Sequence, residues 1–261
     1  MPPARDERPL VDAWLHSPSR AAADRVTGWL RRNTLSFAPI LELDLRHEPC
    51  LVLDLSADSP LLNAPDSDNS EPALTARIHR AMRDTNVRAA VSGYDELRPP
   101  YSSAVGGQRE PDPRVVHLGI DLFAEPGMMV HAPVAGTVHD VGESTSPLGY
   151  GPTVVLRHET ADGTPFFTLY GHLDREALTL CTPGRAVSAG AQVGRIGTAD
   201  VNGGWTPHLH FQVITDLLGL GRRFPGVGHL SRRDAWRALS PDPNLVLGIP
   251  VLSWAPGPRI L

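Results

Sequence analysis

The stretch WTPHLHFQV, Trp205–Val213, places two histidines one residue apart in an apolar run of strand-forming residues. Side chains alternate between the two faces of a β-strand, so His208 and His210 are expected to share one face. A dry protein core seldom holds two imidazoles side by side, because each ring brings two nitrogens that need hydrogen-bond partners. The pair therefore indicates either a functional site or a strand face that meets solvent.

Short β-forming runs separated by glycine and proline turns surround this stretch, from about Val115 onward. They include MMVHAPVAGTVHDV, GPTVVLRHE, FFTLYGHL and QVGRIGT, and they predict an antiparallel β-sheet core. We therefore predict a mainly β protein of the α+β class in three parts. These are an N-terminal α/β segment (1–99), the β core (100–216) and a C-terminal extension with a short helix (217–261).

The N-terminal segment carries its own local signals. Ser17, followed by Pro18, and Ser70 each precede an amphipathic pattern and are predicted to cap a helix. The runs FAPILELDL (37–45) and CLVLDLS (50–56) predict two strands joined by a turn.

Composition excludes several classes of function. The net charge is −5 and no arginine stripe is present, which argues against nucleic acid and anionic membranes as partners. Lysine is absent, so no lysine Schiff base or lysine-tethered prosthetic group is expected. Cys50 and Cys181 show no metal-binding spacing and are interpreted as structural thiols. The charged N-terminus lacks the apolar core of a signal peptide, and no run reaches about 20 apolar residues, so a cytoplasmic location is predicted.

Two further motifs supply histidine and aspartate side chains. HLGID places His117 and Asp121 four residues apart, with Gly119 between them to leave room for a metal or a substrate. LYGHL ends a β run at His172, where a lone histidine is usually a surface residue. Two histidines and an aspartate are a common catalytic zinc set that leaves a fourth position for water.

The order HxGxD, YxHL and HLHF, with APVAGTV and VSAGAQVGRIG between, resembles the M23 (LytM/lysostaphin-type) zinc metallopeptidases over roughly residues 104–215. The resemblance implies that zinc is the cofactor and that His117, Asp121 and His210 bind it. It implies that His172 and His208 act on the water and on the developing oxyanion. Arg109 in GGQR matches an arginine that often precedes the first motif in the family, and it is predicted to contact substrate.

The chain also departs from the family pattern. Gln212 stands where the family often has glutamate, and Trp205 and Thr206 precede the last motif, so the substrate groove is left uncertain. Tyr150 and Trp205 are predicted to line the groove, with ordinary packing as the alternative.

Other residues weighed for a role are interpreted as structural. Tyr94, Glu96 and Arg98 could reach the site, but a structural hinge is favoured. His131, His139 and His158 match no motif and are interpreted as surface or strand-edge residues.

A second resemblance covers about residues 51–250. This span is similar to the metallopeptidase segment of fusion proteins that join it to a kinase and a class III aminotransferase-like domain. It implies a functional link to a kinase or a PLP-dependent enzyme. The function predicted is zinc-dependent hydrolysis of a short peptide or a small cytosolic amide derived from an amino acid. The alternatives are acyl transfer or cyclisation on a small molecule, a peptidoglycan endopeptidase, and a non-catalytic binding module.

Overall fold

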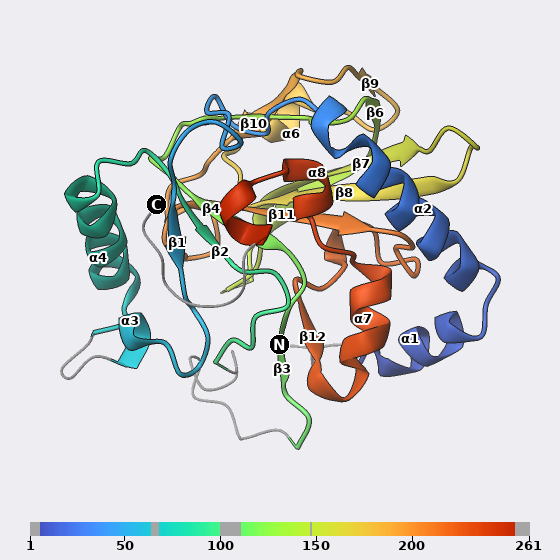
Figure 1. The fold of residues 1–261 in the computed structure, drawn as a ribbon, viewed down its shortest axis with the longest axis horizontal. Helices are drawn as coiled ribbons and strands as arrows, with labels where there is room; N and C mark the ends of the chain where they lie inside the picture. The colour runs from blue at the N-terminus through green and yellow to red at the C-terminus, as the bar shows by residue number, and fades with distance from the viewer. Residues whose placement is uncertain (1–5, 64–67, 100–110, 147, 254–261) are drawn as a thin grey trace.

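The computed structural model describes residues 6–63, 68–99, 111–146 and 148–253 and is built around one eight-stranded sheet (Figure 1). The strand order is β1-β2-β4-β11-β8-β7-β6-β9, and every neighbouring pair is antiparallel except the parallel pair β1 and β2. This α+β architecture confirms the predicted fold class. The strands in this order are Leu51–Leu53, Ala90–Ser92, Ile120–Phe123, His208–Ile214, Pro165–Gly171, Gly151–Glu159, Gly136–Ser144 and Ala186–Val187.

Two smaller antiparallel sheets accompany the main one. In the first, β5 (Met129–His131) pairs with β10 (Gln192–Arg195). In the second, β3 (Arg114–His117) pairs with β12 (Val227–His229), which belongs to the C-terminal extension. The extension is thus joined to the core by strand pairing.

Helices cover both faces of the main sheet. The helices α2 and α8 share a hydrophobic cluster with Leu209, Phe211 and Val213 of β11, while α1 and α7 pack with Ile214 on the opposite face. The helices are α1 (Arg8–Leu15), α2 (Ser19–Asn33), α3 (Pro60–Asn63), α4 (Glu71–Asp84), α6 (Ala177–Leu180), α7 (Arg233–Leu239) and α8 (Asn244–Leu247). The 3₁₀ turns of the described residues are η1 (Thr34–Ser36), η2 (Gly221–Arg223), η3 (Leu230–Arg232) and η4 (Pro250–Ser253).

The N-terminal segment joins the same sheet instead of standing apart from it. The sequence β1-α4-β2 adds a parallel strand pair at one edge, and β2 then pairs with β4 of the core. Ser70 occupies the predicted N-cap position of α4, but its hydroxyl donates to Asp68 and makes no capping hydrogen bond. The three-part division of the chain stays a prediction.

Two local predictions in this segment are wrong. Ser17 does not cap α2, which begins at Ser19, because its hydroxyl donates to the Trp14 carbonyl at the end of the unpredicted helix α1. The run 37–45 forms no strand and makes a single bridge between Leu41 and Val130. Its leucines and isoleucine are nevertheless buried, so an apolar run was mistaken for a strand where a turn-rich chain simply fills the core.

Cys50 and Cys181 are both buried as free thiols. Within the described residues, every helix is too short or too polar to cross a lipid bilayer.

Candidate metal centre and active site

Strand β11 presents His208 and His210 on one face, as the alternation of a strand requires. Its antiparallel neighbour β4 has a register that places His210 opposite Asp121 and His208 opposite Phe123. The Phe123 ring stacks on the His208 ring at a centroid distance of 5.0 Å. The pairing of two central strands therefore sets a carboxylate beside both imidazoles.

His117 ends β3 and reaches the same place through a tight connection to β4. Gly119 lies in this connection, where a Cβ atom would come within 2.5 Å of His210 Cε1 and 2.8 Å of the Phe211 carbonyl oxygen. The space that Gly119 leaves, expected to admit a metal or a substrate, is taken instead by the His210 imidazole. Only glycine lets the connection pass this close to β11.

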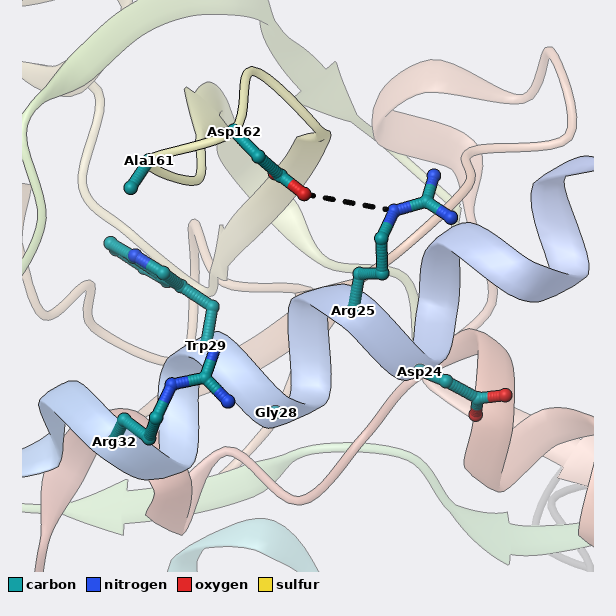
Figure 2. A pocket seen from close by; sticks show the side chains of 7 residues that line it. All are labelled: Asp24, Arg25, Gly28, Trp29, Arg32, Ala161 and Asp162. Atoms are coloured by element: carbon teal, nitrogen blue, oxygen red, sulfur yellow. Dashed lines mark ion pairs between the residues drawn. The ribbon is translucent and has the colours of Figure 1, made fainter.

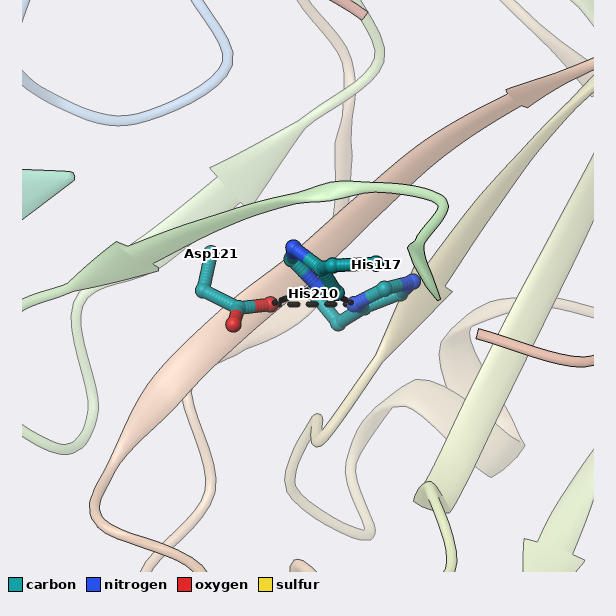
Figure 3. A group of neighbouring side chains, drawn as sticks. All are labelled: His117, Asp121 and His210. Carbon is teal, nitrogen blue, oxygen red and sulfur yellow. Dashed lines mark hydrogen bonds and ion pairs between the residues drawn. The ribbon is translucent and has the colours of Figure 1, made fainter. Parts of the chain in front are cut away.

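His117, Asp121 and His210 point one donor atom each toward a common position (Figure 3). The donor atoms are His117 Nε2, Asp121 Oδ1 and His210 Nδ1, and they lie 2.9–3.3 Å from one another. Ligands bound about 2.0–2.1 Å from a tetrahedral zinc ion lie about 3.3 Å apart. The donor set and its spacing therefore fit a tetrahedral zinc site with one position open.

A chain of hydrogen bonds behind His210 selects the ring nitrogen that faces this position. His210 Nε2 lies 3.0 Å from Gln212 Oε1, and the amide nitrogen of Gln212 donates to Ser240 Oγ at 2.8 Å and to the Pro225 carbonyl at 3.3 Å. The amide oxygen can only accept, so His210 Nε2 carries the proton and Nδ1 keeps its lone pair. Gln212 is completely buried and lies under the site.

His172 and His208 each have one ring nitrogen fixed by a backbone carbonyl. His172 Nδ1 donates to the Asn202 oxygen at 2.8 Å, and His208 Nδ1 donates to the Thr206 oxygen at 2.6 Å. Their rings lie side by side, 4.4 Å between centroids, and His208 Nε2 is 3.7 Å from Asp121 Oδ1. Both Nε2 atoms are thus left to accept a proton beside the candidate metal position.

His172 also adopts a left-handed backbone conformation, with φ of +64°. This conformation is costly for a residue other than glycine and is retained mainly at functional sites. The His172 backbone N–H donates to the Tyr150 carbonyl at 2.7 Å, which holds the residue in place at the end of β8.

Burial disfavours the charged form of three of the site imidazoles. It lowers the pKa of His117 to about 4 and holds the pKa of His172 and of His208 below the ordinary value. Burial alone would raise the pKa of Asp121, but His117, His208 and Arg98 hold it well below its usual range. An ionised carboxylate and neutral imidazoles are the forms that bind a divalent metal.

Of the three residues predicted to contact substrate or line the groove, the structure places two beside the site histidines. Tyr150 lies against the site, with its ring 5.7 Å from the His172 ring and 5.3 Å from the His210 ring, and its hydroxyl donates to the Phe224 carbonyl at 3.2 Å. The Trp205 ring lies 6.2 Å from the His172 ring. Arg109 falls outside the described residues.

Arg98, for which a hinge was favoured, is part of the site. Its guanidinium donates to Asp121 Oδ2 at 2.9 Å and its side chain is 11% exposed. The signal that could have found it is weak, since a Glu-x-Arg pair beside two prolines is common in linkers. Gln212 could have been found, because it continues the alternation that begins with His208 and His210.

The site is closed and lies away from an open hollow elsewhere on the surface. The five site residues are 2–6% exposed. A hollow of about 290 Å³ lies between α2 and the turn after β7, where Trp29, Arg25 and Arg32 meet Asp162 (Figure 2). None of the site histidines lines this hollow, and nothing in it provides a nucleophile or a metal ligand set.

Residues 115–218 match the model of peptidase family M23. This span holds the three candidate metal ligands and both candidate catalytic histidines. This span is therefore similar to an M23 metallopeptidase domain, which confirms the predicted enzyme class. No curated protein matches the chain.

Several solved structures are similar to part of the chain. One is a zinc-containing peptidase from Vibrio cholerae, with 30% identity over 41% of this chain and 30% of that chain and a TM-score of 0.32. Another is the catalytic domain of the antimicrobial peptidase lysostaphin from Staphylococcus simulans, with 26% identity over 54% of this chain and 81% of that domain and a TM-score of 0.33. A third is the catalytic domain of a prophage-encoded M23 protein from Enterococcus faecalis, with 28% identity over 48% and 82% and a TM-score of 0.33. The match spans only 30% of the Vibrio protein and 46% of a putative M23 peptidase from Pseudomonas aeruginosa.

Proposed function

We propose that the protein is a zinc-dependent hydrolase of amide bonds that acts on a short peptide or on a small amide derived from an amino acid. The observation that carries the proposal is the arrangement of the site. Three donor atoms converge on one position, and two further imidazoles, each fixed through Nδ1, turn Nε2 toward it. This is the number and type of groups that metal-assisted amide hydrolysis needs.

In this proposal His117, Asp121 and His210 hold the zinc ion. When bound, zinc supplies a Lewis acid that polarises the amide carbonyl and acidifies water. Gln212 keeps His210 in the tautomer that can bind, and the Gly93 carbonyl, 3.1 Å from His117 Nδ1, does the same for His117.

His172 and His208 carry the proton transfers. Both are neutral at neutral pH, so Nε2 of either ring can accept the proton of the attacking water. The protonated ring then hydrogen-bonds to the oxyanion that develops on the substrate carbonyl or returns the proton to the leaving amine. The division of these roles between the two rings is left open by their similar environments.

The closed site supports a small substrate. With all five site side chains nearly buried, a short ligand can be surrounded, whereas a crosslinked polymer needs an open groove. The net charge of −5 gives no attraction to an anionic polymer. The sequence resembles the metallopeptidase segment of fusion proteins with a kinase and an aminotransferase-like domain, and this resemblance favours a small amino compound as the substrate. Cleavage of peptidoglycan peptides is the second candidate, because residues 115–218 match the M23 family and lysostaphin, to which the chain is similar, is named an antimicrobial peptidase.

The test compares substrates of increasing size on the zinc-loaded full chain. We expect turnover of aminoacyl amides and dipeptides, weaker turnover of pentaglycine, and no release of material from purified sacculi. A competing amine in the same assay separates hydrolysis from acyl transfer, because only transfer gives a new amide. Release of material from sacculi without turnover of small amides would replace the proposed substrate by peptidoglycan. Absence of turnover on every substrate would count against hydrolysis itself.

A further inference from the structure

The guanidinium of Arg98 is buried behind the candidate metal centre, although the residue precedes the matched domain 115–218. Its Nη2 donates to Asp121 Oδ2 at 2.9 Å and to Ser92 Oγ at 2.8 Å, and its Nε lies 2.5 Å from Glu96 Oε2. The side chains of Arg98 and Glu96 are only 11% and 12% exposed. Charges this far from water are tolerated where each has a fixed partner, so the group is a built arrangement and not a surface ion pair.

The backbone around Arg98 is fixed as firmly as its side chain. Its N–H donates to the Val115 carbonyl at 2.8 Å, and His117 exchanges backbone hydrogen bonds with Asp95 and Glu96, each 3.0 Å long. The segment therefore runs along β3 like an added strand. Glu96 is held in turn, because its Oε1 accepts from the Leu55 N–H at 2.8 Å.

The two oxygens of Asp121 have separate partners. Oδ1 faces the candidate metal position, 3.2 Å from His117 Nε2 and 2.9 Å from His210 Nδ1. Oδ2 is turned away and is occupied by Arg98, with the Ser92 hydroxyl 3.4 Å away. We propose that Arg98 is a positioning residue that holds the Asp121 carboxylate so that Oδ1 alone reaches the metal. The inference rests on the proposed zinc site.

The contacts of His117 agree with this assignment. Its Nδ1 lies 3.2 Å from Arg98 Nη2 and 3.1 Å from the Gly93 carbonyl oxygen. A guanidinium only donates and a carbonyl only accepts, so one of the two contacts is the hydrogen bond in each tautomer. When Nε2 serves as a metal ligand, Nδ1 carries the proton and donates to Gly93. The Arg98 N–H groups are then directed to Asp121 and Ser92.

The test measures metal binding, not turnover. The double variant E96Q/R98M removes both buried charges together, so that neither is left without its partner. R98K keeps a cation beside Glu96 but lacks the planar pair of donors. R233M is the matched control, because Arg233 forms a bidentate ion pair with Asp95 in the same segment, away from the metal position. Zinc affinity is measured by competition with a chromophoric chelator, and the visible spectrum of the cobalt-substituted protein reports coordination number.

We expect E96Q/R98M to bind zinc about 10–100-fold more weakly, the usual cost of losing an outer partner of a metal ligand. Its cobalt bands should lose intensity per metal ion, because a freed carboxylate adds its second oxygen and raises the coordination number. R98K should lose about 10-fold in affinity, and R233M should match the wild type. Wild-type affinity and spectrum in R98K and in the double variant would overturn the positioning role while leaving the zinc site in place. If the double variant fails to fold, R98K alone decides. A wild-type chain that binds no metal overturns the proposed function and this inference together.

Discussion

His158 and the histidines of strand β11 are buried on opposite faces of the central sheet, and they differ in how their ring nitrogens are used. His158 on β7 is 2% exposed, and both of its nitrogens have partners, the Ala135 carbonyl oxygen at 2.9 Å and the Thr168 hydroxyl at 2.8 Å. Each site histidine has one nitrogen fixed by an oxygen and the other turned toward a shared position; these are His117, His172, His208 and His210. Burial alone therefore does not mark a functional histidine. The convergence of several ring nitrogens and a carboxylate oxygen on one point does.

His158 also corrects an expectation. It was interpreted as a surface or strand-edge residue, but it is buried, stacked on Phe166 at a centroid distance of 4.9 Å. Burial lowers its pKa to about 4. His139 is exposed, as expected, and His131 is half-buried. A sequence pattern cannot separate His158 from the site histidines, because the Ala135 carbonyl that holds it comes from a distant turn.

The strongest test of the comparison is the loss of a metal ligand. H210A should reduce zinc content from about one ion per chain to nearly none, because two remaining ligands do not hold a catalytic zinc ion. Activity should fall about 10³-fold or more, since the metal supplies several kcal/mol of transition-state stabilisation. Elemental analysis and a peptidase assay measure both.

The partner variant is H158Q, which changes an equally buried histidine. It should keep wild-type zinc content and most of the activity. Equal loss of zinc in H158Q and H210A would mean that metal loss follows from disturbing any buried histidine, and the contrast between His158 and the site histidines would fail.

The two histidines beside the metal position should separate binding from chemistry. H172A and H208A should each keep zinc and lose about 10²–10⁴-fold in kcat, the contribution of a positioned acid or base. Zinc content and kcat measured on the same preparation decide this. Loss of zinc in H208A would assign it to the metal ligands and not to proton transfer.

A smaller effect on zinc affinity is expected from changes at Gln212, which contacts the ligand His210 but does not face the metal position. Q212L leaves the His210 Nε2 proton without its acceptor and should weaken zinc binding about 10–100-fold. Q212E restores an acceptor at the same place and should recover most of the affinity. Chelator competition on both variants measures the difference. Equal affinity in Q212L and the wild type would show that the tautomer of His210 is set by the metal and not by Gln212.

The sequence predicts the site better than it predicts the surroundings of the site. Strand alternation predicts that His208 and His210 share a face, but only the resemblance to the M23 family joins His210 to His117 and Asp121, whose contact depends on the pairing of β4 with β11. Arg98 escapes such reasoning, because its contact with Asp121 depends on how the segment before β3 folds back along it. The apolar run 37–45 fails for a related reason, since hydrophobic composition predicts burial but not the hydrogen-bond partners that would make a strand.

The smallest expected effect concerns acid stability and uses His158 alone. A histidine whose pKa is about 4 in the folded chain, against 6.5 as its ordinary value, binds a proton more readily when the chain is unfolded. Stability that is fully present above pH 6.5 is therefore lost as the pH falls toward 4, and the loss levels off below that. His117, His172 and His208 add losses of the same sign, so the wild-type slope alone does not isolate His158.

The difference in acid stability between the wild type and H158Q isolates the contribution of His158. Between pH 7 and pH 5, the metal-free wild type should lose about 2 kcal/mol more unfolding free energy than metal-free H158Q, as one pKa unit corresponds to about 1.4 kcal/mol. Urea denaturation of both proteins at the two pH values measures this, with chelator present so that metal release does not contribute. H139Q, which alters an exposed histidine, should retain the wild-type slope. If H158Q and the wild type lose the same unfolding free energy between the two pH values, the folded chain accommodates a charged His158. The two hydrogen bonds of His158 would then not keep this residue neutral in the core.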